Sequence, residues 1–459
     1  MVSPPGLKGL NTPAPNIAYF TPQHRQSPGT PRNPSSPNTP TLFTPLKIRN
    51  VTLRNRIVVA PMCQFSTAPE GPSIGALTDY HIATLGHFAL KGAALVFVEA
   101  TGVQANGRIS AYCPGLWDDS QIEGLRRVSD FVKSQGALAG IQLAHAGRKA
   151  SVAPPWVAGS TQTHKASLRA DKDQFGWPED VVGPSGGVEH TWDGLGLREE
   201  GGYWPPRALT RAEIKELVGD WGHAAKRAVA AGVDVIEIHA AHGYLLHQFL
   251  SPVTNRRTDE YGGSFENRTR LLLEIARAMR KEMPDGMPLF VRVSATEWLE
   301  GTEIEKTYGS WTVDDTIKLA KLLPGAGVDL LDVSSGGNHP SSALQSVRAL
   351  PKDYQTKNAA RIRRELKESG SKLLIGAVGL ITEAEQARDL LEADKLLEQE
   401  AVDAKNATET KDGKEPAADI VLIGRQFLRE PEWVLRVAWK LGVDVAWPNQ
   451  FLRVRFPKM

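Results

Sequence analysis

The run Val233-Asp234-Val235-Ile236-Glu237-Ile238-His239 decides the fold class of this chain. It is short, apolar and rich in β-branched residues, and it follows a long amphipathic stretch over residues 210–231. A second helical pattern, over residues 264–282, leads from it to another short apolar run at Leu289–Val293. Alternation of this kind is typical of parallel strands joined by crossover helices.

The alternation continues through most of the chain. Short apolar runs predict strands at Arg56–Pro61, Ala94–Glu99, Leu138–Ala144, Val233–His239, Leu289–Val293, Val328–Val333, Lys372–Gly376 and Ile420–Ile423. Amphipathic patterns predict helices over 79–90, 120–134, 210–231, 264–282, 312–323, 356–368, 383–399 and 427–441. Eight strand–helix pairs predict an α/β fold of the (β/α)8 type, a TIM barrel. A doubly wound sheet is disfavoured because Val59-Ala60-Pro61-Met62, after the first strand, is not a glycine-rich fingerprint.

Composition excludes several classes of protein. The 459 residues are 41% hydrophobic and 23% charged, and 54 basic against 52 acidic residues leave a net charge of +2. Such a balance favours neither nucleic acid nor a membrane surface as a partner. The two cysteines, Cys63 and Cys113, cannot form a disulfide framework or hold an iron–sulfur cluster, which needs about four thiolates. No apolar run approaches the roughly 20 residues of a membrane span, and we expect a cytoplasmic enzyme.

The chain before the barrel has a different composition. Residues 1–40 contain ten of the 31 prolines and no acidic residue. Because proline fixes φ and removes a donor, we predict a disordered arm here and place the barrel at residues 41–459. Within the arm, the apolar patch Ile17-Ala18-Tyr19-Phe20 is a candidate for docking on the barrel.

Two segments are longer than ordinary loops. Residues 150–209 follow the third predicted strand and are rich in tryptophan and tyrosine. Since loops after barrel strands lie on the catalytic face, we predict a lid or capping subdomain in this long connection between the third strand and the third helix. Residues 397–418 are highly charged, and we predict a solvated insertion there.

Polar residues at strand ends are candidates for chemistry, because barrel strands deliver their last residues to the active site. Arg292 lies inside the apolar fifth run, where a guanidinium needs an anion or an acceptor. It could pair with Glu99 or Glu237 as a structural residue. Gly424-Arg425, opening the last helix, offers backbone N–H groups at the usual phosphate site of this fold, and together these features suggest a phosphate-bearing cofactor.

His239 and His242 follow the fourth predicted strand. From the spacing alone, three interpretations stay open. The two residues could be core histidines satisfied by neighbours, metal ligands together with His145, or neutral donors to a substrate oxygen with Tyr244 as a nearby proton donor.

Three longer motifs resemble the Old Yellow Enzyme family. They are Asn55-Arg56-Ile57 through Pro61-Met62-Cys63, Gln142-Leu143-Ala144-His145-Ala146-Gly147-Arg148-Lys149-Ala150, and Glu237 through Leu245 with its continuation to Arg268. The resemblance covers about residues 42–456 and is closest to the thermophilic-like ene-reductases, which carry a cysteine after the first strand.

The resemblance implies an NAD(P)H:flavin oxidoreductase that holds FMN non-covalently and takes hydride from NADPH or NADH. It then reduces the activated C=C bond of an α,β-unsaturated carbonyl compound. The residues expected to line or hold FMN are Ala60, Pro61, Met62, Cys63, Ala100, Gln142, Arg292, Gly376, Val378, Gly379, Gly424 and Arg425. The segments Gly376–Gly379 and Gly424-Arg425 are expected at the phosphate, and Arg292 at the part of the flavin that becomes anionic on reduction.

The resemblance also assigns the catalytic and substrate residues. His239 and His242 are expected to donate to the substrate carbonyl, and Tyr244 to protonate the α-carbon. Cys63 is expected to tune the flavin, with an oxidisable thiolate or an inert buried thiol as the two possible forms. Phe65 stands where the subgroup often has a tyrosine that reaches the substrate, so one donor is lost. Arg453 resembles a tail arginine supplied by a neighbouring subunit, and we expect a homodimer or a higher homo-oligomer.

Other functions remain open at this stage. A metal-dependent barrel hydrolase could use His145, His239 and His242, but it would leave Arg292 unexplained. An FMN-containing isomerase, a demethylase or a pathway-specific reductase would keep the cofactor and change the reaction. A non-catalytic scaffold would leave the whole set of site residues without a role.

Overall fold

The computed structural model describes residues 11–160, 168–342, 350–392 and 415–457. Within these segments, eight parallel strands close into a barrel, which confirms the predicted (β/α)8 fold. In spatial order they are β10 (Leu330–Ser334), β11 (Leu374–Val378), β12 (Ile420–Ile423), β3 (Ile57–Val59), β4 (Leu95–Gly102), β5 (Leu138–Ala144), β8 (Val235–Ala240) and β9 (Leu289–Ser294). Each of the eight predicted runs overlaps one of these strands.

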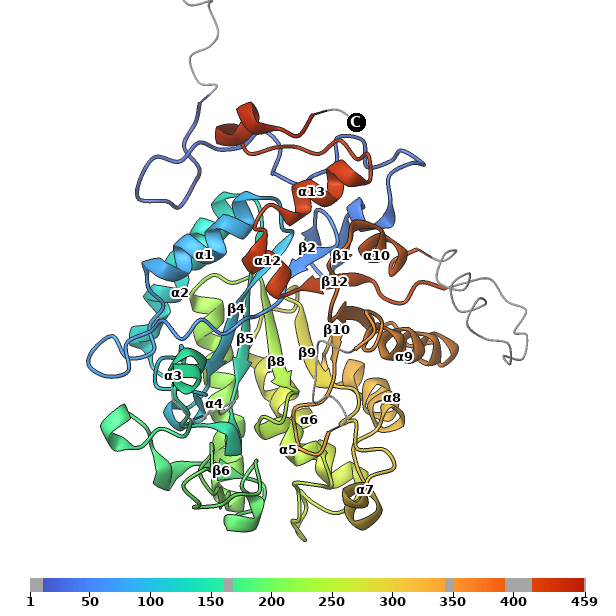
Figure 1. The fold of residues 1–459 in the computed structure, drawn as a ribbon. Coiled ribbons are helices and arrows are strands. Elements are labelled where there is room, and N and C mark those ends of the chain that lie inside the picture. Colours follow the sequence, from blue (N-terminus) through green and yellow to red (C-terminus); the bar gives the residue numbers. More distant parts are fainter. Residues whose placement is uncertain (1–10, 161–167, 343–349, 393–414, 458–459) are drawn as a thin grey trace, which may run out of the picture.

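Helices surround the barrel (Figure 1). They are α1 (Asp79–Leu90), α2 (Ile122–Ser134), α4 (Arg211–Ala230), α6 (Phe265–Glu282), α8 (Val313–Leu322), α9 (Thr356–Glu368), α10 (Ala384–Asp389), α12 (Arg425–Arg429) and α13 (Trp433–Lys440), with the short α5 (Leu245–Leu250) and α7 (Glu303–Tyr308) in loops. The single helix predicted over 427–441 is wrong. Pro431 forces Glu430 out of helical backbone (φ −142°, ψ 82°), so α12 and α13 are separate. Helix α10 is also shorter than the predicted 383–399, and residues 393–414 lie outside the described part.

The barrel interior has an apolar end and a polar end. A hairpin of β1 (Leu46–Ile48) and β2 (Val51–Leu53) packs with inward side chains of the strands, including Val235, Phe290 and Leu330. Two residues further along each strand, the inward positions are polar and buried, namely Glu237, Arg292 and Asp332 with Gln142 of β5 and Glu99 of β4. The carboxyl end of the barrel therefore holds the groups that can do chemistry.

The structure differs from the predicted disorder for residues 11–40. The N–H of Gly29 donates to Ala446 O at 2.9 Å, and the buried Asn55 donates from Nδ2 to Gly29 O at 3.0 Å. A Cβ on Gly29 would lie 2.3 Å from Gly92 O, so the arm and the barrel are in close contact. Prolines exclude a helix here but not an extended segment whose remaining donors bind the barrel. Figure 1 shows this segment beside the C-terminal segment, at the end opposite α5 and β6; residues 1–10 lie outside the described part.

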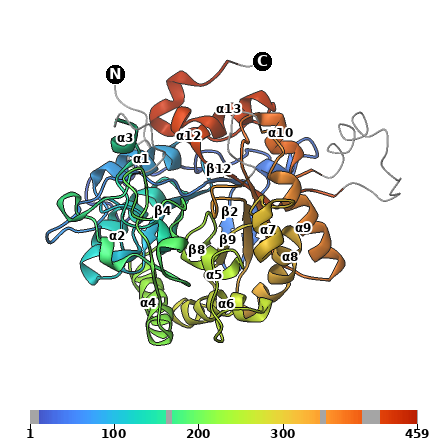
Figure 2. The ribbon, with the colours of Figure 1, turned by 60° about the horizontal axis from the view of Figure 1, so that its bottom comes forward.

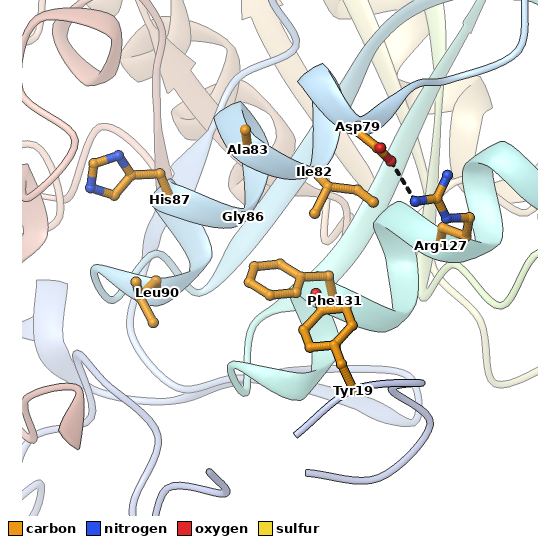
Figure 3. A pocket seen from close by; sticks show the side chains of 9 residues that line it. All are labelled: Tyr19, Asp79, Ile82, Ala83, Gly86, His87, Leu90, Arg127 and Phe131. Carbon is orange, nitrogen blue, oxygen red and sulfur yellow. Dashed lines mark hydrogen bonds and ion pairs between the residues drawn. The ribbon is translucent and has the colours of Figure 1, made fainter. Parts of the chain in front are cut away.

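The apolar patch of the arm reaches helices α1 and α2 (Figure 3). Tyr19 lies at the rim of a hollow of about 500 Å³ that Ile82, Leu90 and Phe131 also line. Tyr19 and Phe20 stay 56% and 60% exposed, so the expected docking of this patch is only partial.

The tryptophan-rich segment, residues 150–209, is anchored to loops at the carboxyl end of the barrel, on the side that Figure 2 brings forward. It contains α3 (Pro155–Ser160) and β6 (Val182–Gly183), which pairs in parallel with β7 (Arg207–Ala208). Indole N–H groups fasten it: Trp177 Nε1 donates to Asn106 O at 3.0 Å and Trp192 Nε1 to Gly337 O at 2.9 Å. The segment thus lies where a cap over the barrel mouth would lie, and residues 161–167 are outside the described part.

The charged insertion predicted at 397–418 lies outside the described residues up to position 414. At its end, Ala417 and Ala418 are buried and donate their N–H groups to Leu390 O, so these two residues belong to the barrel rather than to a solvated loop. In the segments that the structure describes, no helix is both long and apolar enough to cross a membrane.

Asn55→Ala tests the attachment of the arm. The change leaves Gly29 O, Gly92 O and the Ile57 N–H without their buried partner, so we expect a loss of roughly 2–4 kcal/mol in the free energy of unfolding. Urea unfolding followed by tryptophan fluorescence measures it. Thr12→Ala, which removes an exposed hydrogen bond in the same arm, should change it by less than about 0.5 kcal/mol. Equal, small effects of both variants would contradict a fixed arm.

Candidate active site

The segment that follows β3 forms one side of the barrel mouth. Ala60 is buried, whereas Pro61, Met62 and Cys63 are half-buried. The carboxylate of Glu99 holds the segment in place: Oε2 accepts the Gln64 N–H at 2.6 Å, and Oε1 lies 3.3 Å from His81 Nε2. Glu99, a possible partner of Arg292 from the sequence, has this other role in the structure.

Cys63 is a thiol in this environment. Burial raises its pKa well above the ordinary value, and the nearby Cys113 and Glu99 raise it further. The oxidisable thiolate that the sequence left open is therefore disfavoured. Ala100, which the sequence analysis placed beside the cofactor, is buried next to Glu99 on β4.

The polar layer beneath the mouth surrounds one guanidinium. Arg292 Nε donates to Asp332 Oδ2 at 2.6 Å and lies 3.6 Å from Glu237 Oε1, which also accepts from Gln142 Nε2 at 2.7 Å. The predicted pairing with Glu237 is thus present. Asp332 was missed, although an acid inside the apolar run of β10 was the signal that could have found it.

The histidine pair lies directly above this layer. The ring centroids of His239 and His242 are 5.1 Å apart, and the Tyr244 ring is 4.8 Å from that of His239. His239 Nδ1 accepts the Ala241 N–H at 3.2 Å, which leaves the proton on Nε2. His242 Nε2 lies 2.6 Å from Ser334 Oγ, and a hydroxyl that donates there leaves the proton of His242 on Nδ1. The structure therefore brings the three predicted catalytic side chains together and adds Ser334.

Both imidazoles are neutral at ordinary pH. Burial lowers the pKa of His239 well below its ordinary value, and the neighbouring His242 and Arg292 lower it further. The pKa of His242 is lowered by burial and by the charges of Arg292 and Lys149. Burial raises the pKa of Tyr244 well above its ordinary value, so the phenol keeps its proton.

The turn that carries His242 depends on Gly243, on its neighbour Gly337 and on Lys149. His242 has φ +59° and Gly243 φ +74°, and a Cβ on Gly243 would lie 2.2 Å from Gly337 O. Lys149 Nζ donates to His242 O at 2.9 Å and to Gly337 O at 3.0 Å. The sequence analysis quoted Lys149 within a motif and missed this role, which only a contact between the β5 and β8 ends reveals.

His145 does not join the pair. Its Nδ1 accepts the Gly147 N–H at 3.1 Å, and its ring packs against Gly107. Among the described residues, no group of three or more His, Cys, Asp or Glu side chains could hold a metal ion. The hydrolase interpretation therefore lacks its ligand set.

The glycines predicted at the phosphate fall into two groups. Gly376 is buried in the barrel core, where a Cβ would lie 2.6 Å from Leu422, so close packing by itself explains the glycine and its place at the phosphate stays a prediction. Val378 and Gly379 are half-buried at the mouth. At Gly424 the nearest atom to an added Cβ is Met62 Sδ at 3.7 Å, and Arg425 is exposed at the start of α12.

Phe65 and Arg453 occupy different ends of the molecule. Phe65 has φ +51° and contacts Trp156 edge-to-face at 5.9 Å, beside the mouth. Arg453 is exposed in a short helix whose Phe451 lies 3.6 Å from Lys91 Nζ, directly after α1 ends at the opposite face of the barrel. Within one chain the structure does not bring Arg453 to the histidine pair.

A closed (β/α)8 barrel with a buried arginine beneath paired histidines at its carboxyl end defines a barrel enzyme with a small-molecule site. Residues 41–397 match the family model described as NADH:flavin oxidoreductase / NADH oxidase family, and the chain belongs to that family.

Curated relatives and solved structures agree with this assignment. The chain is 43% identical over 443 residues to an NADH:flavin oxidoreductase of Gibberella zeae, covering 96% of this chain and 94% of the relative. It is 38% identical over 412 residues to an NADPH dehydrogenase of Listeria monocytogenes, covering 90% and 98%. Morphinone reductase in complex with tetrahydroNAD superposes with a TM-score of 0.59 at 26% identity, covering 90% and 93%, and an Old Yellow Enzyme homologue of Zymomonas mobilis with 0.58 at 25%, covering 92% and 97%.

The resemblance to the Old Yellow Enzyme family is thus confirmed. The protein is an NAD(P)H-dependent flavin oxidoreductase of the FMN-using type.

The buried histidines predict a pH-dependent stability. Burial lowers the pKa of His145 and of His247 to about 3, so the unfolded chain takes up these protons below about pH 6.5 while the folded chain does not. Each histidine then costs about 1.4 kcal/mol of unfolding free energy per pH unit between these limits. We expect the wild type to lose roughly 2 kcal/mol relative to His145→Gln between pH 6.5 and 5, measured by urea unfolding.

His223→Gln is the control, because His223 is exposed on α4. Its stability difference from the wild type should not change with pH. The same flat difference for His145→Gln would show that His145 titrates normally and is not buried as described.

Proposed function

We propose that this protein takes hydride from NADPH, with NADH as the second possible donor, and reduces the activated C=C bond of α,β-unsaturated carbonyl compounds. The observation that carries the proposal is the meeting of two neutral imidazoles and a protonated phenol at the barrel mouth, directly above a buried guanidinium. When bound, FMN supplies the two-electron chemistry that connects the nicotinamide to the alkene.

The mouth fits a flat, phosphate-bearing cofactor. Arg292 Nε and Nη2 both lie against Asp332 Oδ2, at 2.6 and 2.5 Å, so Nη1 is the guanidinium nitrogen that can receive a polar edge of a ligand. The segment Ala60–Cys63 offers half-buried backbone beside it, and the space at Gly424 lies at the N-terminal end of α12. These features belong to β9 and to the segments after β3 and β12, around the same barrel mouth as the histidine pair.

We therefore assign FMN contacts to Ala60, Pro61, Met62, Cys63, Ala100, Gln142, Arg292, Val378, Gly379, Gly424 and Arg425. Gln142 and Arg292 would hold the polar edge of the flavin ring. Backbone N–H groups at Gly379, Gly424 and Arg425 would hold the phosphate, where glycine leaves room for close approach.

His239 and His242 bind the substrate carbonyl through their N–H groups. Hydrogen bonds to that oxygen draw electron density from the β-carbon, which makes it a better hydride acceptor. The donors must be neutral imidazoles with fixed tautomers, and Ala241 N–H and Ser334 Oγ fix them. No metal is needed for this polarisation.

Tyr244 protonates the α-carbon. Its phenol keeps the proton until the substrate has become carbanionic at that carbon. Lys149, whose pKa burial lowers to about 7, lies with its Nζ 5.4 Å from the Tyr244 ring centroid and holds the turn on which Tyr244 depends.

Phe65 and Trp156 form an apolar wall beside this site, which favours substrates without a polar group at that edge. We further propose that Arg453 acts from a neighbouring copy in a homodimer or higher homo-oligomer, because within one chain it lies at the far end of the barrel. We also propose a cytoplasmic location for the protein.

An FMN-containing isomerase or a pathway-specific reductase is the second candidate. It would use the same cofactor contacts without releasing a simple saturated ketone. The presence of Tyr244 at the histidine pair favours reduction, since net reduction needs a proton donor at the α-carbon.

The double variant His239→Ala/His242→Ala tests the carbonyl contact. We expect phenol binding to be lost and kcat/KM for cyclohexenone to fall by about 100-fold or more, because two charge-stabilising donors are removed, while FMN stays bound. Flavin absorbance and steady-state kinetics measure both quantities. His223→Ala, on the exposed face of α4, is the control; loss of flavin from the double variant would contradict the substrate role.

Tyr244→Phe tests the proton donor. We expect oxidation of the reduced enzyme by cyclohexenone to slow by about 100-fold, with reduction by NADPH nearly unchanged, since only the half-reaction with the enone needs the α-carbon proton. Stopped-flow absorbance separates the two steps. Tyr308→Phe, 47% exposed on α7, is the matched control. Equal slowing of both steps would show that Tyr244 is not the proton donor.

A further inference from the structure

The polar layer beneath the mouth has an unequal number of positive and negative groups. Arg292, Glu237 and Asp332 are buried, with side-chain exposures of 6%, 0% and 0%. One guanidinium therefore faces two carboxyl groups on the neighbouring strands β8 and β10. A fully ionised layer would carry one uncompensated negative charge inside the barrel.

The hydrogen bonds of the layer leave one oxygen of each carboxyl group without a donor. Arg292 Nε donates a hydrogen bond to Asp332 Oδ2, and Gln142 Nε2 donates one to Glu237 Oε1. Glu237 Oε2 and Asp332 Oδ1 are buried and have no hydrogen-bond partner. The two carboxyl groups lie within hydrogen-bond reach of each other, so a single proton between them can satisfy both.

Among the described residues, no neighbouring strand supplies a second cation. On β4, Glu99 is acidic and occupied by Gln64 and His81, and after β3, Cys63 is a thiol. On β8, His239 is neutral, and the inward positions Gly376 of β11 and Leu422 of β12 cannot ionise.

We propose that Glu237 and Asp332 share one proton at neutral pH, with Glu237 as the donor and Asp332 as the ionised partner of Arg292. The layer is then neutral. Burying an unpaired carboxylate costs several kcal/mol, so neutralisation by a proton is the less costly state. Burial raises the pKa of Glu237 to about 8, and the hydrogen bond with Asp332 raises it as well.

The shared proton has a consequence for the redox site, and this step depends on the proposed function. Two ionised carboxylates would cancel the charge of Arg292 and oppose negative charge on a bound flavin. One proton removes that opposition, so Arg292 can stabilise the reduced cofactor. Glu237 and Asp332 are positioning residues, since they act through Arg292 rather than on the substrate.

Infrared spectroscopy of the FMN-loaded full chain tests the shared proton. At pH 6.5 we expect a carbonyl-stretch band of a buried carboxylic acid that shifts in D₂O. The band should vanish in Glu237→Gln, and also in Asp332→Asn, because Glu237 then ionises to pair with Arg292. Glu216→Gln, an exposed change on α4, should leave the band unchanged. A band that is absent in the wild type, or that survives in Asp332→Asn, would overturn the proposal.

The midpoint potential of bound FMN tests the link to the redox site. As pH rises through about 8, ionisation of Glu237 adds a negative charge, so the wild-type potential should fall more steeply with pH than that of Glu237→Gln. Parallel curves with the infrared band present would mean that FMN does not lie above this layer, which contradicts the proposed cofactor position. If the wild type lacks the infrared band but still reduces the enone, the shared proton is overturned and the proposed function stands.

Discussion

A guanidinium enclosed by a β-barrel is the constraint on which the rest of this site depends. Arg292 cannot be buried among apolar strands without acceptors, and Asp332 and Glu237 on the adjacent strands supply them. The apolar layer below, with Phe290 and Leu330, keeps water away from the group. Asp332 occupies Nε and Nη2 of the guanidinium, which leaves Nη1 for a ligand with a polar edge.

The neutral state of the histidine pair depends on the same positive charge of Arg292. Arg292 and Lys149 both disfavour protonated imidazole at His242, so the pair remains a pair of neutral N–H donors. Lys149 also fixes the left-handed turn at His242 through two carbonyl groups. Electrostatics and backbone geometry thus act on the same few residues, and the tryptophan-rich segment is tied to the same turn through Gly337.

The sequence predicted the barrel because strand and crossover periodicity are local properties, and α1 and α9 begin and end where the pattern places them. It also predicted the histidine pair and Tyr244, which lie in one continuous motif. It did not predict Asp332, Ser334 or the role of Lys149, because these act through contacts between strands that are far apart in the chain. The packing of Gly376 against Leu422 was not predictable for the same reason, because these residues lie on different strands.

The arm shows the limit of compositional reasoning. Its prolines and lack of acids are typical of disorder, yet Asn55 and Ala446 satisfy its backbone groups at the closed end of the barrel. Residues at the amino end of the barrel strands stabilise the fold, whereas residues at the carboxyl end form the active site.

The most direct test of the central claim is the visible spectrum of the purified protein, followed anaerobically through addition of NADPH and then of cyclohexenone. The account predicts flavin bands that bleach with NADPH and return with the enone. Bands that bleach and do not return would contradict enone reduction while leaving the flavin oxidoreductase assignment in place.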